Sequence, residues 1–94
     1  MNEPVIGTVC TSRAGRDKGR AFVILGICDE NHVLLCDGET RRVERPKKKK
    51  LMHLHIEPCH ADEIGKRVTE GASLLDADVR KALNRLGYNV NKGN

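Results

Sequence analysis

Aromatic side chains are nearly absent from this sequence of 94 residues, in which Phe22 and Tyr88 are the only examples. The hydrophobic core must therefore be built from Val, Ile, Leu, Met and Cys. RNA-binding modules of the RRM type stack bases on several exposed aromatic rings, and this chain has no such set. Any contact with nucleic acid is accordingly expected to be made to phosphates and to folded RNA shape.

The chain also lacks a long hydrophobic run. No stretch approaches the roughly 18 apolar residues that a membrane-spanning helix requires. The start, Met-Asn-Glu-Pro, has neither the basic residues nor the apolar segment of a secretory signal. We therefore expect a cytoplasmic protein that does not enter a membrane, and the length supports a single small domain.

Metal-site spacing is missing as well. No Cys-x-x-Cys pair occurs, and three of the four cysteines lie inside apolar runs, which favours free buried thiols in a reducing compartment; they are Cys10, Cys28, Cys36 and Cys59. A second candidate cluster has no completing pair of ligands; it comprises His53, His55, Cys59 and His60. We predict no metal ion and no other cofactor. The alternative is a metal-dependent domain, which the metal content of the purified protein would reveal.

No catalytic constellation is present. Ser12 and Ser73 lack the sequence context of a serine nucleophile. Cys59 and His60 are adjacent on an extended segment, where neighbouring side chains point to opposite faces and do not form a nucleophile and base pair. We therefore predict that the protein is not an enzyme.

Short apolar runs separated by turn signals occupy the region up to Pro58. Asp37-Gly38 favours a tight two-residue hairpin turn. The second run is apolar almost throughout, which implies that a barrel or a docked helix covers both of its faces. The pattern predicts a mainly β fold, a small bent barrel of five strands over residues 5–12, 21–28, 33–36, 39–44 and 51–56.

Helical character begins only after Pro58. Residues 62–70 have the signal for a helical turn or two, which Gly65 weakens. Residues 76–86 have a stronger signal, with acidic residues near the start, basic residues later and Gly87 as a terminator. We predict two parts, a barrel over residues 1–58 and a helical C-terminal extension over residues 59–94.

Positive charge is concentrated in one half of the chain. The formal net charge is +4, and residues 13–50 contain 11 basic and 6 acidic residues, whereas residues 51–94 contain 6 of each. Such a local surplus attracts nucleic acid or an anionic membrane. The candidate RNA-binding residues form two groups that a barrel could bring together, Arg13, Arg16, Lys18 and Arg20, and then Arg41, Arg42, Arg45, Lys47, Lys48, Lys49 and Lys50.

The first group surrounds a glycine-bounded loop, residues 14–20, between the first two predicted strands. Gly15 and Gly19 allow positive φ angles and so shape a sharp turn. Arg16 is suited to bidentate phosphate binding, and Lys18 adds a mobile charge. A solvated hairpin tip has the same composition, and the lysine run equally fits a protective feature beside a weak edge strand. Two basic groups in one small domain favour nucleic acid.

The stretch GTVCTSRAGRDKGRAFVI, residues 7–24, resembles a KOW motif, which occurs in ribosomal proteins and transcription elongation factors. The resemblance extends further along the chain, to the fourteenth large-subunit ribosomal protein of archaea and eukaryotes. It rests on four segments in this order: the stretch above, Asp37-Gly38, the basic segment from Arg41, and His-Leu followed by Glu-Pro within residues 53–58. Small bacterial KOW proteins described as RNA-binding are also similar. The resemblance covers residues 5–58, and Ala21 stands where many KOW motifs have glycine.

The resemblance implies an SH3-like barrel whose loops lie against ribosomal RNA. It implies that Gly15 and Gly19 shape the loop and that Arg16 and Lys18 contact RNA. We therefore predict non-catalytic RNA binding, to ribosomal RNA or in association with the ribosome, by a protein that is a monomer when free. Ribosomal proteins and RNA polymerase are the other predicted partners. The alternative is a protein-interaction adaptor of the transcription or translation machinery, which would keep its partner after RNA is destroyed.

Overall fold

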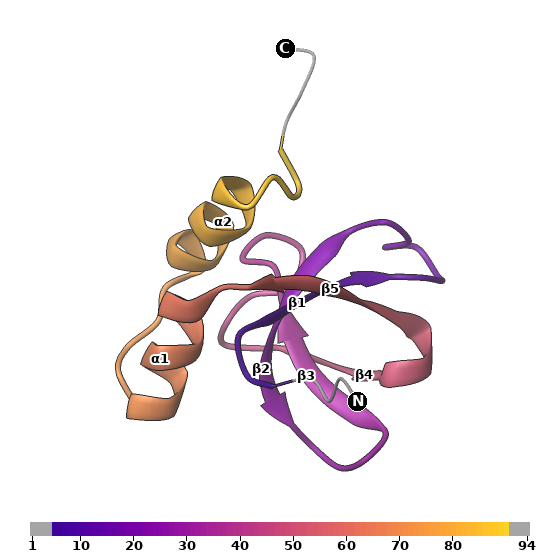
Figure 1. The fold of residues 1–94 in the computed structure, drawn as a ribbon, viewed down its shortest axis with the longest axis horizontal. Coiled ribbons are helices and arrows are strands. Elements are labelled where there is room, and N and C mark those ends of the chain that lie inside the picture. The colour runs from indigo at the N-terminus through magenta and orange to yellow at the C-terminus, as the bar shows by residue number, and fades with distance from the viewer. Residues whose placement is uncertain (1–4, 91–94) are drawn as a thin grey trace.

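The structure, a computed structural model, describes residues 5–90. The chain forms a mainly β, SH3-like fold of five antiparallel strands followed by two helices (Figure 1). The strands lie in the order β4-β3-β2-β1-β5, so that β5 returns to pair with β1. The predicted mainly β, five-stranded class is confirmed. The strands are β1 Thr8–Ser12, β2 Ala21–Ile27, β3 His32–Cys36, β4 Lys47–Lys50 and β5 Leu54–His60.

A 3₁₀ turn, η1, joins the two edge strands β4 and β5 and covers Leu51–His53. Arg13 N donates a hydrogen bond to His53 O at 2.9 Å, and Leu51 N donates one to Asn31 O at 2.8 Å. These bonds attach η1 to the loop after β1 and to the loop before β3. The turn therefore brings the last strand back across the sheet to β1, which gives the sheet its barrel shape.

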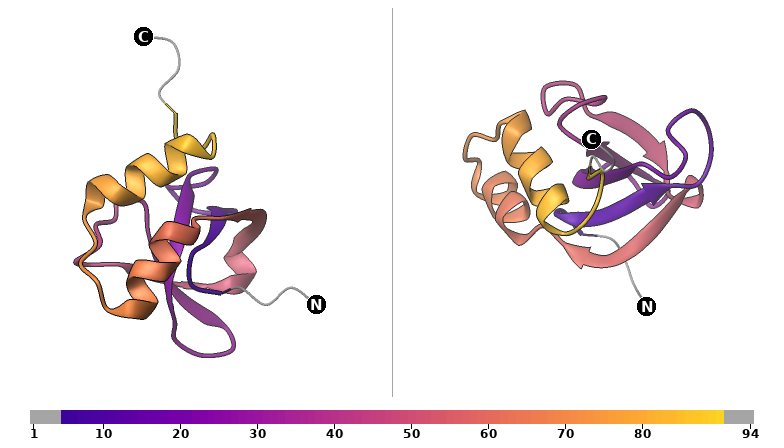
Figure 2. Two further views of the ribbon diagram at one scale, coloured as in Figure 1. Left: turned by 60° about the vertical axis from the view of Figure 1, so that its left-hand side comes forward. Right: turned by 90° about the horizontal axis from the view of Figure 1, so that it is seen from above.

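Side chains of β2 point alternately into two cores. Phe22 and Ile24 lie inside the barrel, whereas Val23 faces the helices, which pack against one side of the sheet (Figure 2). Both faces of β2 are thus covered, as its apolar run predicts. The barrel core also contains Cys10, Val33, Leu35 and Leu54, and the second core also contains Val9, Ala21, Cys36, Ala61, Ile64, Val79, Ala82 and Leu83.

The two helices, α1 (Asp62–Glu70) and α2 (Asp76–Arg85), match the two predicted helical segments. The glycine that weakens the signal of α1 has a packing role: a Cβ atom on Gly65 would lie 2.9 Å from Ile6 O, so glycine allows α1 to approach the N-terminal segment closely. No helix within residues 5–90 is long and apolar enough to cross a membrane.

The fourth strand lies later than the sequence predicts. The prediction of a strand over residues 39–44 is wrong, because this segment forms an irregular loop and the lysine run that follows it forms β4. Asp37-Gly38 does not make a two-residue turn. Asp37 N and Gly38 N both donate hydrogen bonds to Arg41 O, at 3.1 and 3.0 Å, so the chain closes a wider loop around the Asp37 side chain.

The strand β4 consists of four consecutive lysines. Its backbone pairs with β3, from Lys47 opposite Leu35 to Lys50 opposite His32. Lys47 and Lys49 are half-buried on one face, while the two lysines between and after them are exposed on the other. Long apolar stems allow lysine to cover a sheet while its ammonium group stays near water, which is why charged residues can form this edge strand.

The last strand also differs from its predicted limits. The sequence predicts a strand over residues 51–56, whereas the chain first forms η1 and β5 then covers Leu54–His60. Pro58 is accommodated because β5 lies at the edge of the sheet with β1 as its neighbour. A proline in an edge strand need not remove a hydrogen bond between strands.

Replacing Leu83 with alanine is expected to lower the free energy of unfolding by about 2–5 kcal/mol, because its side chain is fully buried between α2 and the sheet. The matched control Leu75→Ala removes a leucine that is 64% exposed, and it should change that free energy by no more than about 0.5 kcal/mol. Urea unfolding followed by circular dichroism measures both. Equal effects would contradict the packing of α2 on the sheet.

Candidate nucleic-acid interface

The first basic loop, residues 13–20, connects β1 to β2 and has a defined shape. Gly15 and Gly19 have φ angles of 86° and 87°, in a region that glycine adopts without steric cost. Ser12 N donates to Arg20 O at 3.0 Å, and Gly19 N donates to Ser12 O at 2.8 Å. These bonds close the base of the loop and leave its tip projecting from the barrel.

Asp17 anchors the first basic loop to β4. Its Oδ1 atom accepts a hydrogen bond from Ser12 Oγ at 2.7 Å and one from Lys49 Nζ at 3.3 Å. Burial acts to raise the pKa of Asp17, but these two hydrogen bonds and the positive charges of Lys49 and Lys47 together outweigh burial and hold the pKa below its usual value. Lys49, with a side chain only 11% exposed, is therefore engaged by the protein itself.

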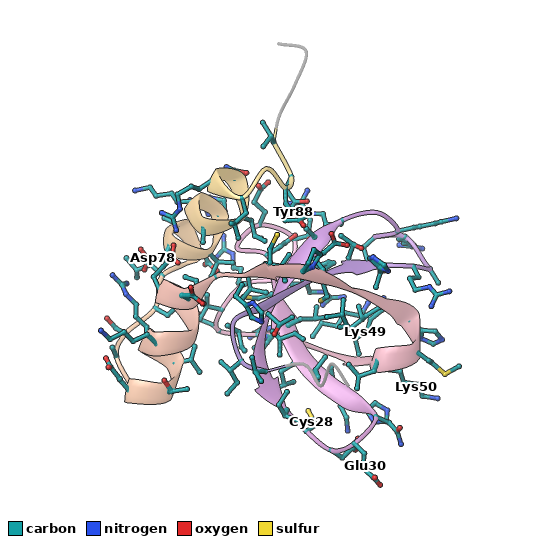
Figure 3. All side chains as sticks on the ribbon, viewed as in Figure 1. Cys28, Glu30, Lys49, Lys50, Asp78 and Tyr88 are labelled. Atoms are coloured by element: carbon teal, nitrogen blue, oxygen red, sulfur yellow. The ribbon has the colours of Figure 1, made fainter. Side chains whose placement is uncertain are left out.

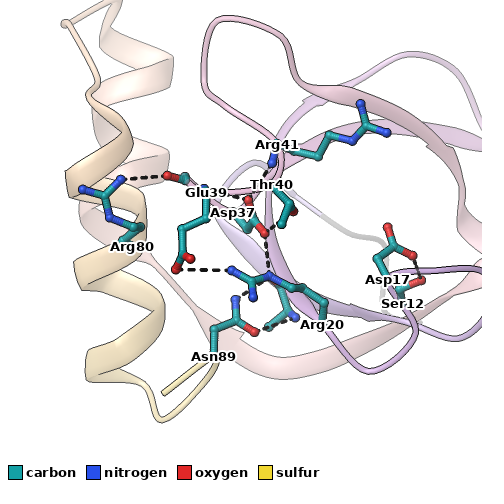
Figure 4. A network of polar contacts seen from close by, with 11 residues as sticks. Ser12, Asp17, Arg20, Asp37, Glu39, Thr40, Arg41, Arg80 and Asn89 are labelled. Carbon is teal, nitrogen blue, oxygen red and sulfur yellow. Dashed lines mark hydrogen bonds and ion pairs between the residues drawn. The ribbon is translucent and has the colours of Figure 1, made fainter. Parts of the chain in front are cut away.

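The second basic loop, residues 37–46, is folded around the buried carboxylate of Asp37 (Figure 4). Within its own loop, this carboxylate accepts three hydrogen bonds, of 2.9, 2.6 and 2.8 Å, from Glu39 N, Thr40 Oγ1 and Arg41 N. A fourth donor comes from the first basic loop, since Arg20 Nε donates to Asp37 Oδ2 at 2.6 Å. One carboxylate thus binds both loops.

Asp37 remains charged at neutral pH. Burial acts to raise its pKa, but hydrogen bonds from its own loop and from Arg20 outweigh burial and lower the pKa. The guanidinium group of Arg20 also pairs with a second acid, since Nη2 lies 3.3 Å from Glu39 Oε1. This buried nitrogen forms an ion pair but no hydrogen bond. Arg20 is therefore largely neutralised by the second basic loop.

The two basic loops and β4 enclose a surface groove of about 390 Å³. Five of its eight lining residues carry positive charge, and Asp17 is its one acidic residue. A neighbouring hollow of about 430 Å³ shares Thr40 and Arg41 with the groove and adds Arg42 and Arg45, together with two glutamates. The groove is lined by Gly15, Arg16, Asp17, Arg20, Thr40, Arg41, Lys47 and Lys49.

The cations of the groove differ in how they are compensated. Arg20 and Lys49 pair with Asp37 and Asp17. Within residues 5–90 no carboxylate forms an ion pair with the other three cations, which are Arg16, Arg41 and Lys47. The groove therefore has a net positive charge that the described part of the chain does not neutralise, and it is suited to an anionic ligand.

The remaining basic candidates lie outside the groove. Arg13 and Lys18 are exposed on the first basic loop. Lys48 and Lys50 are exposed on the opposite face of β4, and Figure 3 places Lys50 at the outer margin of the sheet. Lys50 lines a separate hollow of about 370 Å³ with Asn31, His32 and Met52. The fold thus brings only some members of the two predicted basic groups together at the groove, Arg16 and Arg20 from the first and Arg41, Lys47 and Lys49 from the second.

The C-terminal segment reaches this interface, which the sequence pattern does not predict. Ala21 N donates to Asn89 Oδ1 at 3.0 Å, and Asn89 Nδ2 donates to Ala21 O at 2.9 Å. Arg80 Nη1 of α2 donates to Gly38 O at 2.8 Å. These contacts join residues 68 and 42 positions apart, so no local pattern marks them. The Asp37-Gly38 signal marks a turn but not the burial of its carboxylate.

Of the four cysteines, Cys10 and Cys36 are buried, Cys59 is half-buried and Cys28 is exposed, so the expectation of buried thiols is wrong for Cys28. Burial raises the pKa of the Cys10 and Cys36 thiols to about 12, which keeps them protonated and poorly nucleophilic. Cys59 accepts a hydrogen bond from Tyr88 OH at 3.6 Å, a contact that raises the pKa of the tyrosine together with burial and Glu57. Across residues 5–90 no three His, Cys, Asp or Glu side chains are grouped so as to hold a metal ion.

No family model matches the sequence, but named relatives do. The chain is 30% identical over 82 residues to Large ribosomal subunit protein eL14 of Sulfolobus acidocaldarius, which covers 87% of this chain and 78% of the relative. It is 35% identical, with the same coverage, to the protein of that name from Staphylothermus marinus. A Bacillus subtilis protein named as a candidate ribosome-binding protein, YbzG, is 30% identical over 66 residues, 70% of this chain and 89% of its own length.

Replacing Asp37 with asparagine should lower the free energy of unfolding at pH 7 by about 1.5–3 kcal/mol, because it removes charge from the hydrogen bond with Arg20. The folded-state pKa of Asp37 is lowered from the ordinary value of an aspartate, so the stability that its charge contributes is present above that ordinary pKa and is lost as the pH falls through the lower folded-state pKa. Urea unfolding between pH 7 and pH 2.5 measures this. The difference between the wild type and the variant should shrink as the pH falls below the ordinary pKa of an aspartate, and a difference that stays constant would contradict the assignment.

Proposed function

This chain belongs to the family of Large ribosomal subunit protein eL14, and we propose that it associates with the ribosome by binding ribosomal RNA, without catalysing a reaction. The names of its relatives describe a ribosomal protein and a ribosome-binding protein. Association with ribosomes would also place the protein in the cytoplasm.

The observation that carries the proposal is the convergence of two basic loops on one groove. Arg16 comes from the first basic loop, Arg41 from the second, and Lys47 from β4, and none of the three has a carboxylate partner in the described residues. RNA carries one negative charge at each phosphate. A groove with several uncompensated cations on rigid supports binds such a backbone through charge-assisted hydrogen bonds.

The basic residues have two kinds of role in this proposal. Arg20 and Lys49 hold the loops through Asp37 and Asp17, and Gly15 and Gly19 give the first basic loop its turn. The other cations contact phosphates in three places. Arg16, Arg41 and Lys47 do so in the groove, and Arg13, Lys18, Arg42 and Arg45 do so beside it. Lys48 and Lys50 extend the contact to the opposite face of β4.

Binding of this kind depends on electrostatics and shape. Each neutralised phosphate releases counterions, so affinity falls steeply as salt is added. The two aromatic residues of the chain do not form a stacking platform, since Phe22 is buried in the barrel core and Tyr88 packs beside the second core. Base identity is therefore read weakly, and structured ribosomal RNA is a better ligand than an unstructured strand.

The double substitution Arg16→Ala/Lys18→Ala should raise the Kd for structured ribosomal RNA by about tenfold or more and reduce the slope of log K against log salt by about 2, one for each lost phosphate contact. The matched control Lys66→Ala/Lys81→Ala removes two exposed charges from the helices and should change the Kd by less than about twofold. Fluorescence anisotropy at several salt concentrations measures both. Equal losses in the two variants would contradict a specific role for the loop.

Association with the ribosome is tested separately from RNA affinity. The full chain should sediment with large ribosomal subunits, and the Arg16→Ala/Lys18→Ala variant should sediment with them less. Purified ribosomal proteins and RNA polymerase, treated with ribonuclease, should not retain the chain. Retention of wild type and variant alike on such a protein would contradict RNA binding and favour a protein-interaction adaptor.

A further inference from the structure

We propose that the C-terminal segment, residues 76–89, holds both basic loops in the shape that binds RNA, with Asp76, Arg80 and Asn89 as its positioning residues. The inference rests on the proposed RNA binding at the groove. It adds residues that act on affinity although none of the three lines the groove between the basic loops.

Asn89 fastens the point where the first basic loop enters β2. Its amide group makes two hydrogen bonds to one residue, accepting from Ala21 N at 3.0 Å and donating to Ala21 O at 2.9 Å. β3 pairs with β2 only from Val23 onward, so Asn89 supplies the partners that β3 does not provide to Ala21. Asn89 has a φ of 53°, which asparagine adopts more readily than most residues.

α2 fastens the second basic loop at two points. Arg80 Nη1 donates to Gly38 O at 2.8 Å, and Asp76 Oδ1 accepts from Val43 N at 2.8 Å. The approach is close, because a Cβ atom on Gly38, which has a φ of 80°, would collide with Asp76 O. Helix and loop therefore fit in this position only with glycine at residue 38.

The contacts of Arg80 and Asn89 form one continuous set with the pair of Arg20 and Glu39 (Figure 4). Arg80 holds Gly38, the next residue Glu39 pairs with Arg20, and Asn89 holds the residue that follows Arg20. The C-terminal segment thus supports both loops from the side of the helices.

A preformed groove binds RNA more tightly than one that must be ordered at each encounter. Ordering a loop on binding costs free energy, and a protein with its binding shape only partly populated has a proportionally weaker apparent affinity. Loss of a positioning contact therefore raises the Kd while the phosphate contacts in the complex stay the same in number. The salt dependence of binding should stay constant, which separates positioning from direct contact.

The first test compares Asn89→Ala with Asn84→Ala. Asn84 is an exposed residue of α2 whose side chain makes no hydrogen bond within residues 5–90. Asn89→Ala should raise the Kd for structured ribosomal RNA by about fivefold to tenfold, the effect of two lost hydrogen bonds, with an unchanged salt slope. Asn84→Ala should bind as the wild type does. Equal affinities for the two variants, or a reduced salt slope for Asn89→Ala, would overturn the role of Asn89.

The second test compares Asp76→Ala with Asp78→Ala. Both remove one acidic residue from the first turn of α2, and Asp78 contacts Leu75 N and Arg67 rather than either basic loop. Loss of an acid strengthens RNA binding through net charge alone. Positioning predicts the opposite sign for Asp76→Ala, a Kd raised about threefold to tenfold, whereas Asp78→Ala should bind at least as tightly as the wild type. Tighter binding by both variants would overturn the role of Asp76.

Hydrogen exchange without RNA distinguishes failure of this inference from failure of the proposed function. In Asn89→Ala the amides of Gly19 and Arg20 should exchange faster, and in Asp76→Ala those of Gly38 and Arg41 should do so, at a temperature where circular dichroism shows both variants folded. Unchanged exchange would overturn the inference even if RNA binding is established. Absence of RNA binding by the wild type would overturn the proposed function instead, and with it the effect on affinity.

Discussion

The structure depends on one buried carboxylate. Asp37 is removed from water, and a charge in that position is tolerated only when hydrogen bonds replace its hydration. Three donors come from its own loop, and the fourth, Arg20, comes from the loop between β1 and β2. Satisfying a single side chain therefore requires both basic loops to adopt one relative position. The shape of the groove follows from this requirement.

The same requirement divides the positive charge of the chain into two parts. Arg20 and Lys49 are paired with acids inside the protein, so their charges are used to hold the loops. Arg16, Arg41 and Lys47 line the same groove without such partners in residues 5–90. A binding surface for a polyanion needs both parts, because the free cations repel one another and the neighbouring ion pairs hold the backbone that carries them in place against this repulsion.

The helices are more than a covering layer on the barrel. Their apolar residues complete the second core, and their polar residues reach the loops that form the groove. The likeness to Large ribosomal subunit protein eL14 extends over 82 residues of the chain, so it includes more than the 58 residues of the predicted barrel. The likeness therefore extends beyond the predicted barrel, and the burial of Leu83 joins α2 to the sheet physically.

Local patterns in the sequence were sufficient for the mainly β class, for both helices, for the covered strand β2 and for the glycine-bounded loop, because each rests on periodicity or turn chemistry within a few residues. The resemblance to the ribosomal family was equally visible in short ordered motifs. Tertiary structure decided the rest. Residues 39–44 became a loop and the lysines after them became β4, because the Asp37 carboxylate gathers donors from both sides. Contacts across the fold decide which cations are paired with acids. They also bring Asn89 to Ala21, which no local pattern can predict because the two residues are 68 positions apart in the sequence.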